Sequence, residues 1–234
     1  MDKVDVWKQE LKDAARPEKV KILSSFFKTY KGGYGEGDIF IGIIVPDNRK
    51  IAKKYSILPL HSIQILLCDP IHEFRLSALL ALVEKFKKAS AEEKAEIVSF
   101  YLSNACYINN WDLVDLSAPQ IIGTSMLQGG RELLFKLSKS TNIWEQRIAI
   151  VSTYTLIKAG DFGTTIQLAQ TYLNHPHDLI HKASGWMLRE VGKRNEETLI
   201  SFLDEFATQM PRTALRYAIE KLPDDKRQYY LKLK

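Results

Sequence analysis

The chain has 234 residues, of which 45% are hydrophobic and 26% are charged, a balance typical of a soluble protein with one large domain or two small ones. No apolar run reaches membrane-spanning length and the N-terminus lacks a signal-peptide pattern, so we expect a cytoplasmic protein without membrane contact. The net charge of +5 permits a polyanionic partner but does not require one.

Helical patterns follow one another from the N-terminus onward. Val4, Trp7 and Leu11 are spaced for an amphipathic helix that ends near Arg16, and Pro17 opens the next helix at its first position. Residues 90–93 form a capping-box pattern at the start of a later helix. Further helices are expected over about 46–55, 59–67, 71–88, 90–106, 111–117, 119–127, 130–139, 143–159, 162–173, 178–193, 195–208, 212–221 and 224–232.

Two stretches interrupt this pattern. Residues 31–37 carry glycine at positions 32, 33, 35 and 37 and predict a mobile turn, without the Gly-Lys-Ser/Thr ending of a phosphate-binding loop. Residues 39–45 have the composition of a short strand, but no second strand is evident, so we expect a buried connector leading to a helix that begins at Pro46. The sequence therefore predicts an all-α protein.

The cysteines and histidines give little indication of a metal site. Cys68 and Cys106 are far apart without a Cys-x-x-Cys pattern, and their apolar neighbours predict two buried small side chains. His175, His177 and His181 lack an acidic motif that would complete a site. We expect a helix-connecting turn there, and neither a metal nor another cofactor.

The helices also repeat. Arg75, Arg147, Lys182 and Arg212 each stand near a helix start and are followed by a small residue within three positions. Their spacing, roughly 35 residues or twice that, is typical of HEAT-like or armadillo-like helix pairs. We predict one domain over residues 1–234, a monomeric right-handed superhelical solenoid of such repeats.

In a solenoid of this kind, the second helix of each pair lines a concave face. The four basic residues of the repeat would then form a column that matches the spaced phosphates of a duplex. The alternative is that each basic residue is solvated or pairs with a neighbour such as Glu145.

The stretch from Asn109 to Asp115 stands out among these helices. Asn110 is a good N-cap, and a helix that begins there places Trp111 and Asp115 on one face, four residues apart. An aromatic plane beside a carboxylate favours a cationic group. The plain alternative is a core tryptophan and a solvated or capping acid, but Trp186 on a corresponding helix favours a shared cleft.

Three short motifs resemble one family. They are Trp-Asp-Leu-Val-Asp at 111–115, Asn-Ile-Trp-Glu-Gln-Arg at 142–147 and Lys-Ala-Ser-Gly-Trp-Met-Leu-Arg-Glu at 182–190. In this order and spacing the chain resembles the AlkD-like DNA glycosylases of the DNA alkylation repair family, which are built from HEAT-like repeats. The resemblance covers about the middle and C-terminal two-thirds of the chain. Residues 41–49 look like the start of the family's third helix, and the glycine-rich 31–37 departs from the family.

The resemblance implies roles for individual residues. Trp111 and Trp186 correspond to two tryptophans that cradle the deoxyribose of a damaged nucleotide, and Asp115 corresponds to the essential carboxylate. Arg147 and Arg189 correspond to arginines that contact the DNA backbone.

Three further DNA contacts are expected. Phe26 falls where the family can carry an aromatic residue that approaches the duplex. Lys182 and Arg75 are expected to bind DNA as members of the basic column.

The implied activity is excision of cationic N3- or N7-alkylated purines, such as 3-methyladenine and 7-methylguanine, from double-stranded DNA in base excision repair, without base flipping. Such a base is already a good leaving group, so one carboxylate can stabilise the developing cation at C1′ and orient water. Two alternatives stay open: a non-catalytic HEAT-like module that binds DNA or a protein, and a protein that binds alkylated or branched DNA without turnover.

Overall fold

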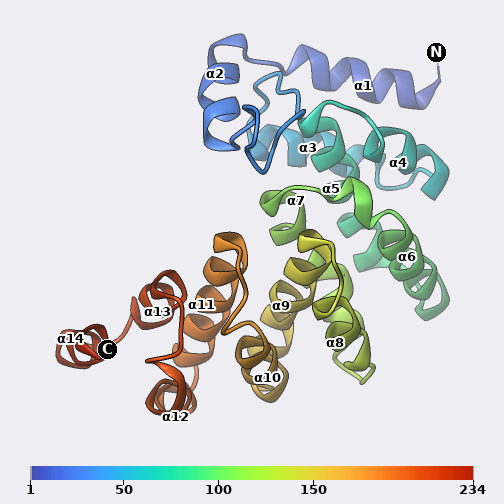
Figure 1. Ribbon diagram of the computed structural model, residues 1–234. Coiled ribbons are helices and arrows are strands. Elements are labelled where there is room, and N and C mark those ends of the chain that lie inside the picture. The colour runs from blue at the N-terminus through green and yellow to red at the C-terminus, as the bar shows by residue number, and fades with distance from the viewer. Residues whose placement is uncertain (1, 234) are drawn as a thin grey trace. The chain divides into compact units, whose positions relative to one another are not determined.

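The computed structural model describes residues 2–233, and within them the protein is all-α (Figure 1). These residues form fourteen α-helices, one 3-10 turn and one π-helical turn, and an isolated parallel bridge joins Ile39 to Ile71. None of the described helices is long and apolar enough to cross a membrane. The chain divides into two compact units, Met1–Ser117 and Ala118–Lys234.

In the first unit the helices gather around α5. This central helix contacts α3, α4, α6 and α7, and its buried residues lie on nearly every side. A helix buried all round needs partners on all faces, which explains why residues 76–83 are apolar except for Ser77. The elements are α1 Lys3–Asp13, α2 Pro17–Phe26, α3 Val45–Tyr55, α4 Leu60–Leu67, α5 His72–Lys88, α6 Ala91–Ser103, the 3-10 turn η1 Ala105–Tyr107 and α7 Trp111–Asp115.

Local sequence signals place several helix starts correctly. Pro17 is the first residue of α2, as expected, where its missing N–H costs nothing. Ser90 and Glu93 form the predicted capping box of α6, each side chain accepting the other residue's backbone N–H. The helix expected to begin at Pro46 begins one residue earlier.

The apolar stripe of α1 is buried as predicted. Trp7 and Leu11 are fully buried and Val4 nearly so. The Trp7 ring stacks on Tyr55 of α3 with centroids 5.0 Å apart, and its indole N–H donates to Ser77 Oγ of α5 at 3.0 Å. The polar edge of the ring is thereby satisfied inside the core.

In the second unit α9, α11 and α13 pack in succession, while α8, α10 and α12 pack on them. This is the helix-pair arrangement that the repeat predicts. The elements are η2 Pro119–Gly123, α8 Glu132–Ser138, α9 Ile143–Lys158, α10 Gly163–Thr171, α11 Asp178–Gly192, α12 Glu196–Phe206, α13 Arg212–Ile219 and α14 Asp224–Lys232.

The helix expected over 119–127 starts as the π-helical turn η2. Two hydroxyl groups of α9 donate hydrogen bonds to carbonyl oxygens at the start of η2. Ser152 Oγ donates to the oxygen of Ala118 at 3.4 Å, and Thr155 Oγ1 donates to the oxygen of Pro119 at 2.5 Å. Such side-chain bonds compete with regular helical pairing and widen the turn. A Cβ on Gly123 would lie 2.3 Å from the oxygen of Ser152, so η2 and α9 approach at backbone contact distance.

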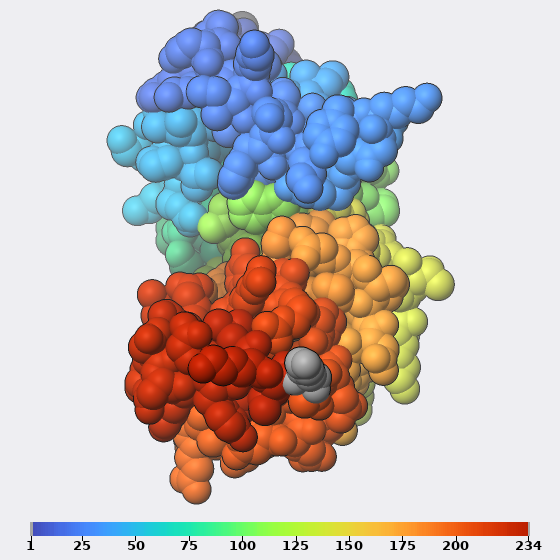
Figure 2. Space-filling model, turned by 60° about the vertical axis from the view of Figure 1, so that its left-hand side comes forward, coloured from blue at the N-terminus to red at the C-terminus, as the bar shows by residue number. Residues whose placement is uncertain are grey.

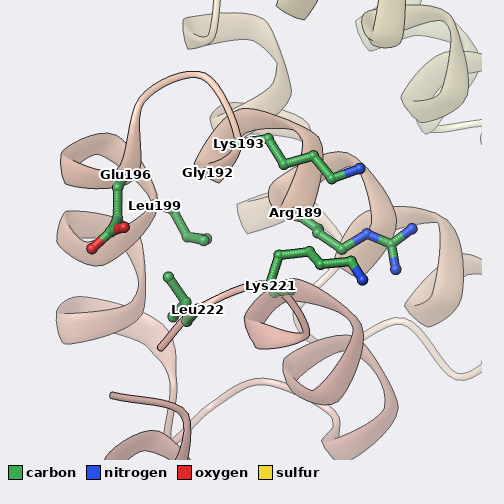
Figure 3. Close-up of a pocket in the computed structure, with 8 residues that line it drawn as sticks. Arg189, Gly192, Lys193, Glu196, Leu199, Lys221 and Leu222 are labelled. Atoms are coloured by element: carbon green, nitrogen blue, oxygen red, sulfur yellow. The ribbon is translucent and has the colours of Figure 1, made fainter. Parts of the chain in front are cut away.

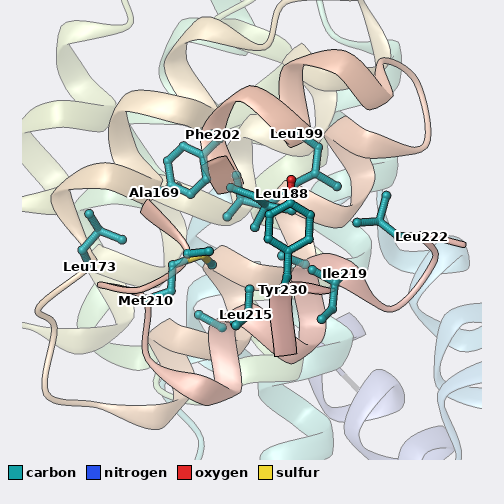
Figure 4. Close-up of a cluster of buried hydrophobic side chains, with 14 residues drawn as sticks. Ala169, Leu173, Leu188, Leu199, Phe202, Met210, Leu215, Ile219, Leu222 and Tyr230 are labelled. Atoms are coloured by element: carbon teal, nitrogen blue, oxygen red, sulfur yellow. The ribbon is translucent and has the colours of Figure 1, made fainter. Parts of the chain in front are cut away.

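The core of the second unit lies where α11, α12 and α13 meet, and α14 covers it (Figure 4). Leu188, Phe202 and Leu215 are almost fully buried there. Tyr230 of α14 reaches the same cluster and donates its hydroxyl to Asp204 at 2.6 Å. The space-filling view shows these C-terminal helices, coloured orange to red, as one continuous packed body (Figure 2).

The prediction for the cysteines is wrong, since Cys68 and Cys106 are both exposed free thiols. Cys68 is the C-cap of α4 and Cys106 lies in η1, so both stand at helix ends whose apolar neighbours turn inward. Apolar neighbours in sequence indicate a buried side chain only within a helix, because beyond its end the side chains no longer repeat on the same face.

Both thiols should therefore react with a disulfide reagent such as DTNB in the native protein, with a stoichiometry of two before any denaturant is added. Cys68→Ser and Cys106→Ser should each remove one equivalent. A native protein that labels only after unfolding would show that the thiols are buried.

Candidate functional site

Trp111 and Asp115 begin and end α7, so the predicted pair shares one short helix. Asn110 is the N-cap, as expected: its backbone is extended and its Oδ1 accepts the N–H of Trp111 at 2.8 Å. Both Trp111 and Asp115 are half-buried, which leaves part of each side chain accessible to a ligand.

A buried polar network holds the start of α7. His72 of α5 is 1% exposed, and its ring nitrogens face two carboxylates, Asp38 Oδ2 at 3.0 Å and Asp112 Oδ2 at 2.8 Å. Asp38 also accepts from Asn110 Nδ2 at 3.0 Å and from Arg75 Nη2 at 2.5 Å. We call these five residues the His72 network; the N-cap of α7 and its second residue, Asp112, both belong to it.

Attraction between opposite charges explains how His72 and Asp38 can be ionised in the interior. Burial by itself would lower the pKa of His72, but the carboxylates of Asp112 and Asp38 raise it to about 9. Burial also opposes ionisation of Asp38, yet the hydrogen bond from His72 and the charge of Arg75 bring its pKa below the usual value. The imidazolium and its partners therefore form a charged, hydrogen-bonded cluster in the interior.

The connector before α3 is shaped by a second buried carboxylate. Glu73 is 2% exposed, and its oxygens accept the backbone N–H groups of Ile41, Gly42 and Ile43 at 2.8 to 3.2 Å. These N–H groups need no neighbouring strand, so the strand-like composition forms no sheet here. A Cβ on Gly42 would lie 2.0 Å from the oxygen of Arg16, and its φ is +94°, so only glycine fits.

An aromatic stack supports Trp111. Its ring lies on Phe27 at 5.1 Å with planes 16° apart, and Phe26 meets it edge-on at 5.6 Å. Phe40 continues the stack behind Phe27 at 5.0 Å, and His72 lies on Phe40 at 4.5 Å. Phe26 is 59% exposed, so the structure brings two predicted site residues, Phe26 and Trp111, together at the surface of the first unit.

Asp115 closes α7 near another buried pair. Tyr101 and Ser117 exchange a hydroxyl–hydroxyl hydrogen bond of 2.8 Å. Burial raises the pKa of Tyr101 and the charge of Asp115 raises it further, while the bond to Ser117 lowers it. The negative charge of Asp115 therefore acts on the buried hydroxyl of Tyr101.

In the second unit, Trp186 stands on α11 and tilts against Tyr154 of α9, with ring centroids 6.0 Å apart. Tyr154 has cations over its ring, with Lys158 Nζ at 4.7 Å and the guanidinium of Arg194 at 5.9 Å. This second aromatic residue beside Trp186 was not predicted, because it becomes visible only when α9 and α11 are packed together.

The predicted basic residues have different surroundings. Arg75, 6% exposed, bonds to Asp38 and to backbone oxygens, and Arg147, 5% exposed, donates to the oxygen of Leu179 at 2.6 Å. These placements favour structural roles within each unit, and the phosphate contacts expected of these two arginines stay predictions. Arg212, at the C-terminal end of the expected column, donates to the oxygen of Leu231 at 2.8 Å.

Lys182 and Arg189 lie nearer the surface. Lys182 pairs with Asp178 one turn away on α11 at 2.7 Å, and Arg189 pairs with Glu220, the C-cap of α13. Arg189 also lines a cavity of about 240 Å³, where the side chains of Arg189, Lys193 and Lys221 are directed to the same side (Figure 3). The cavity offers several cationic groups close together.

The chain is similar to a known family and to solved structures. A family model described as "DNA alkylation repair enzyme" matches residues 7–222. A solved structure titled "Predicted DNA alkylation repair enzyme from Enterococcus faecalis" is similar with a TM-score of 0.70 and 18% identity, covering 90% of this chain and 97% of that chain. No curated protein matches in sequence. At this identity the structural likeness establishes the fold, and it confirms the all-α, HEAT-like class.

The His72 network makes a pH dependence testable. The pKa of His72 is raised from 6.5 to about 9, so the stability it contributes is fully present below pH 6.5 and is lost as pH rises through about 9. Urea unfolding should show a loss on the order of 3 kcal/mol over this window. His72→Gln should be less stable and show a flatter profile; a flat wild-type profile would contradict a protonated His72.

Proposed function

The chain belongs to the DNA alkylation repair enzyme family, and we propose that it is a monofunctional DNA glycosylase for cationic N3- or N7-alkylated purines in duplex DNA. The observation that carries the proposal is the arrangement at α7. A half-buried tryptophan and a half-buried carboxylate lie on one helix whose start is fixed by the His72 network. We propose further that the protein acts as a cytoplasmic monomer and needs no cofactor.

The chemistry of the substrate suits a single carboxylate. When the C1′–N bond breaks, its electron pair goes to the cationic purine, which leaves as a neutral base without a general acid. The sugar becomes an oxocarbenium-like cation, which Asp115 stabilises. Asp115 also orients the water that adds to C1′ and accepts its proton, and the products are free base and an abasic site.

The aromatic residues complement the carboxylate. In this proposal the exposed part of Trp111 faces the deoxyribose, and its π-electrons favour the positive charge that develops there. Trp186 is proposed to contact a deoxyribose in the same manner, as the family resemblance implies. Neither role requires an enclosed pocket for the base, and we propose that the lesion is excised without base flipping.

DNA binding is assigned to the more accessible residues. Phe26 stands beside Trp111 and offers an exposed ring to the duplex. Lys182 and Arg189 can exchange their carboxylate partners, Asp178 and Glu220, for phosphate oxygens. Each exchange replaces one ion pair by another, so these contacts contribute chiefly through release of counterions from the DNA.

The alternative is a non-catalytic HEAT-like module that binds DNA or a protein. A module of that kind needs helix faces and surface charge, but it does not need a carboxylate one helical turn from a stacked tryptophan. The geometry around Asp115 therefore favours catalysis, and a direct assay separates the two functions.

Asp115→Asn should abolish base release while leaving DNA binding intact. Loss of the charge removes transition-state stabilisation, with an expected fall in rate of at least about 100-fold. The measurement is single-turnover release of 3-methyladenine and 7-methylguanine from methylated duplex DNA, alongside a binding titration. Asp13→Asn, an equal charge change at an exposed site on α1, is the control and should behave as wild type.

Two outcomes would count against this assignment. Full activity of Asp115→Asn would remove Asp115 from the mechanism. A wild-type protein that binds DNA in a salt-dependent manner but releases no base would support the non-catalytic alternative.

Arg189→Ala should weaken DNA binding and reduce the slope of log Kd against log salt concentration by about one, because one phosphate contact is lost. The variant Arg131→Ala removes the same charge from an ion pair with Asp161 and serves as the control. An unchanged slope in Arg189→Ala would show that this arginine pairs with Glu220 and contacts no phosphate.

A further inference from the structure

The glycine-rich segment 31–37 lies against the end of α2. Gly35 donates its N–H to the oxygen of Lys28 at 3.3 Å, and Gly33 donates to the oxygen of Tyr30 at 2.9 Å. A Cβ on Gly35 would stand 2.3 Å from the oxygen of Phe27, and a Cβ on Gly33 would stand 1.9 Å from that of Lys28. Glycine at these two positions lets the segment pack against the backbone that precedes it.

This packing places the hydroxyl of Tyr34 within hydrogen-bond distance of Trp111. The indole Nε1–H of Trp111 donates to Tyr34 Oη at 3.2 Å, and the same hydroxyl donates to the backbone oxygen of Phe26 at 3.1 Å. An indole can only donate, whereas a phenol can accept one bond and donate another, so Tyr34 is complementary to both partners. The bond joins residues 77 positions apart in the chain.

Three contacts now define the orientation of the Trp111 ring. Phe27 supports one face, Phe26 meets the ring edge-on, and Tyr34 binds its only polar atom. Turning the indole would break the hydrogen bond and disturb the stack on Phe27 at once. The ring is therefore held before any ligand arrives.

The segment and α7 also share an anchor. Asp38, just after the glycines, accepts from Asn110 at 3.0 Å and from His72 at 3.0 Å. On the other side of the segment, Phe27 lies in the aromatic stack with Trp111. Both ends of the segment are thus tied to the structure that holds α7.

We propose that Tyr34 is a positioning residue for Trp111, and that the glycine-rich segment serves to place it there. This inference rests on the proposed glycosylase function. The hydroxyl of Tyr34 fixes the indole plane in the orientation that faces the deoxyribose, so no ring reorientation is needed as charge develops at C1′. The effect falls on the rate of base release and leaves DNA affinity unchanged.

The test compares Tyr34→Phe with Tyr30→Phe. Tyr30→Phe removes a hydroxyl from a tyrosine four positions earlier that is 59% exposed, and it is a matched control. Tyr34→Phe should lower the single-turnover rate about fivefold, which corresponds to one hydrogen bond, with Kd for methylated duplex within about twofold of wild type. Tyr30→Phe should change neither quantity.

A second readout does not depend on activity. The indole ¹⁵N–¹H resonance of Trp111, assigned by its loss in Trp111→Phe, should shift in Tyr34→Phe and stay in place in Tyr30→Phe. Gly35→Ala should shift the same resonance, because the added Cβ has no room beside Phe27 and displaces the segment.

The outcomes separate the two proposals. An unshifted resonance, or a wild-type rate in Tyr34→Phe, would overturn the positioning role while leaving the glycosylase in place. If the wild type releases no base, the proposed function fails, and with it the catalytic purpose of Tyr34. The resonance shift would then show only that Tyr34 orients the ring.

Discussion

The imidazole of His72 lies between the carboxylates of Asp38 and Asp112, and the arrangement of the candidate site depends on it. One carboxylate comes from the segment after the glycines and the other from α7, so a single side chain of α5 joins both to the core. Burial opposes charge on His72 and Asp38, and both keep it because each is paired and hydrogen-bonded. Removing one partner would leave a buried charge uncompensated, which makes the placement of α7 specific as well as stable.

Trp111 connects this support to the proposed chemistry. Its ring ends an aromatic stack that begins at His72 and passes through Phe40 and Phe27, while its N–H is held by Tyr34. The same features that stabilise the first unit therefore also limit the motion of a residue proposed to face the substrate. Preorganisation of this kind suits a reaction in which the leaving group is already activated and the protein supplies mainly electrostatic stabilisation.

The fold alone does not decide between an enzyme and a binding module, because helix-pair repeats serve both. The family match covers residues 7–222 and gives alkylation repair as the general function. The finer assignment rests on Asp115, on Trp111 and on the surroundings of α7. The exposed ring of Phe26 beside Trp111 adds a surface suited to DNA, whereas the burial of Arg75 and Arg147 indicates that part of the basic repeat stabilises the protein itself.

The sequence by itself determined the all-α class, most helix limits, the Asn110 cap of α7 and the α6 capping box, because these depend on periodicity and on groups a few residues apart. Only the tertiary structure decided which acid meets His72, where the hydroxyl of Tyr34 goes and which arginines are buried. These contacts are between residues 30 or more positions apart, and a local sequence pattern does not indicate which distant residues meet. The exposed cysteines have the same origin, since a helix end can turn a side chain outward whatever its neighbours are.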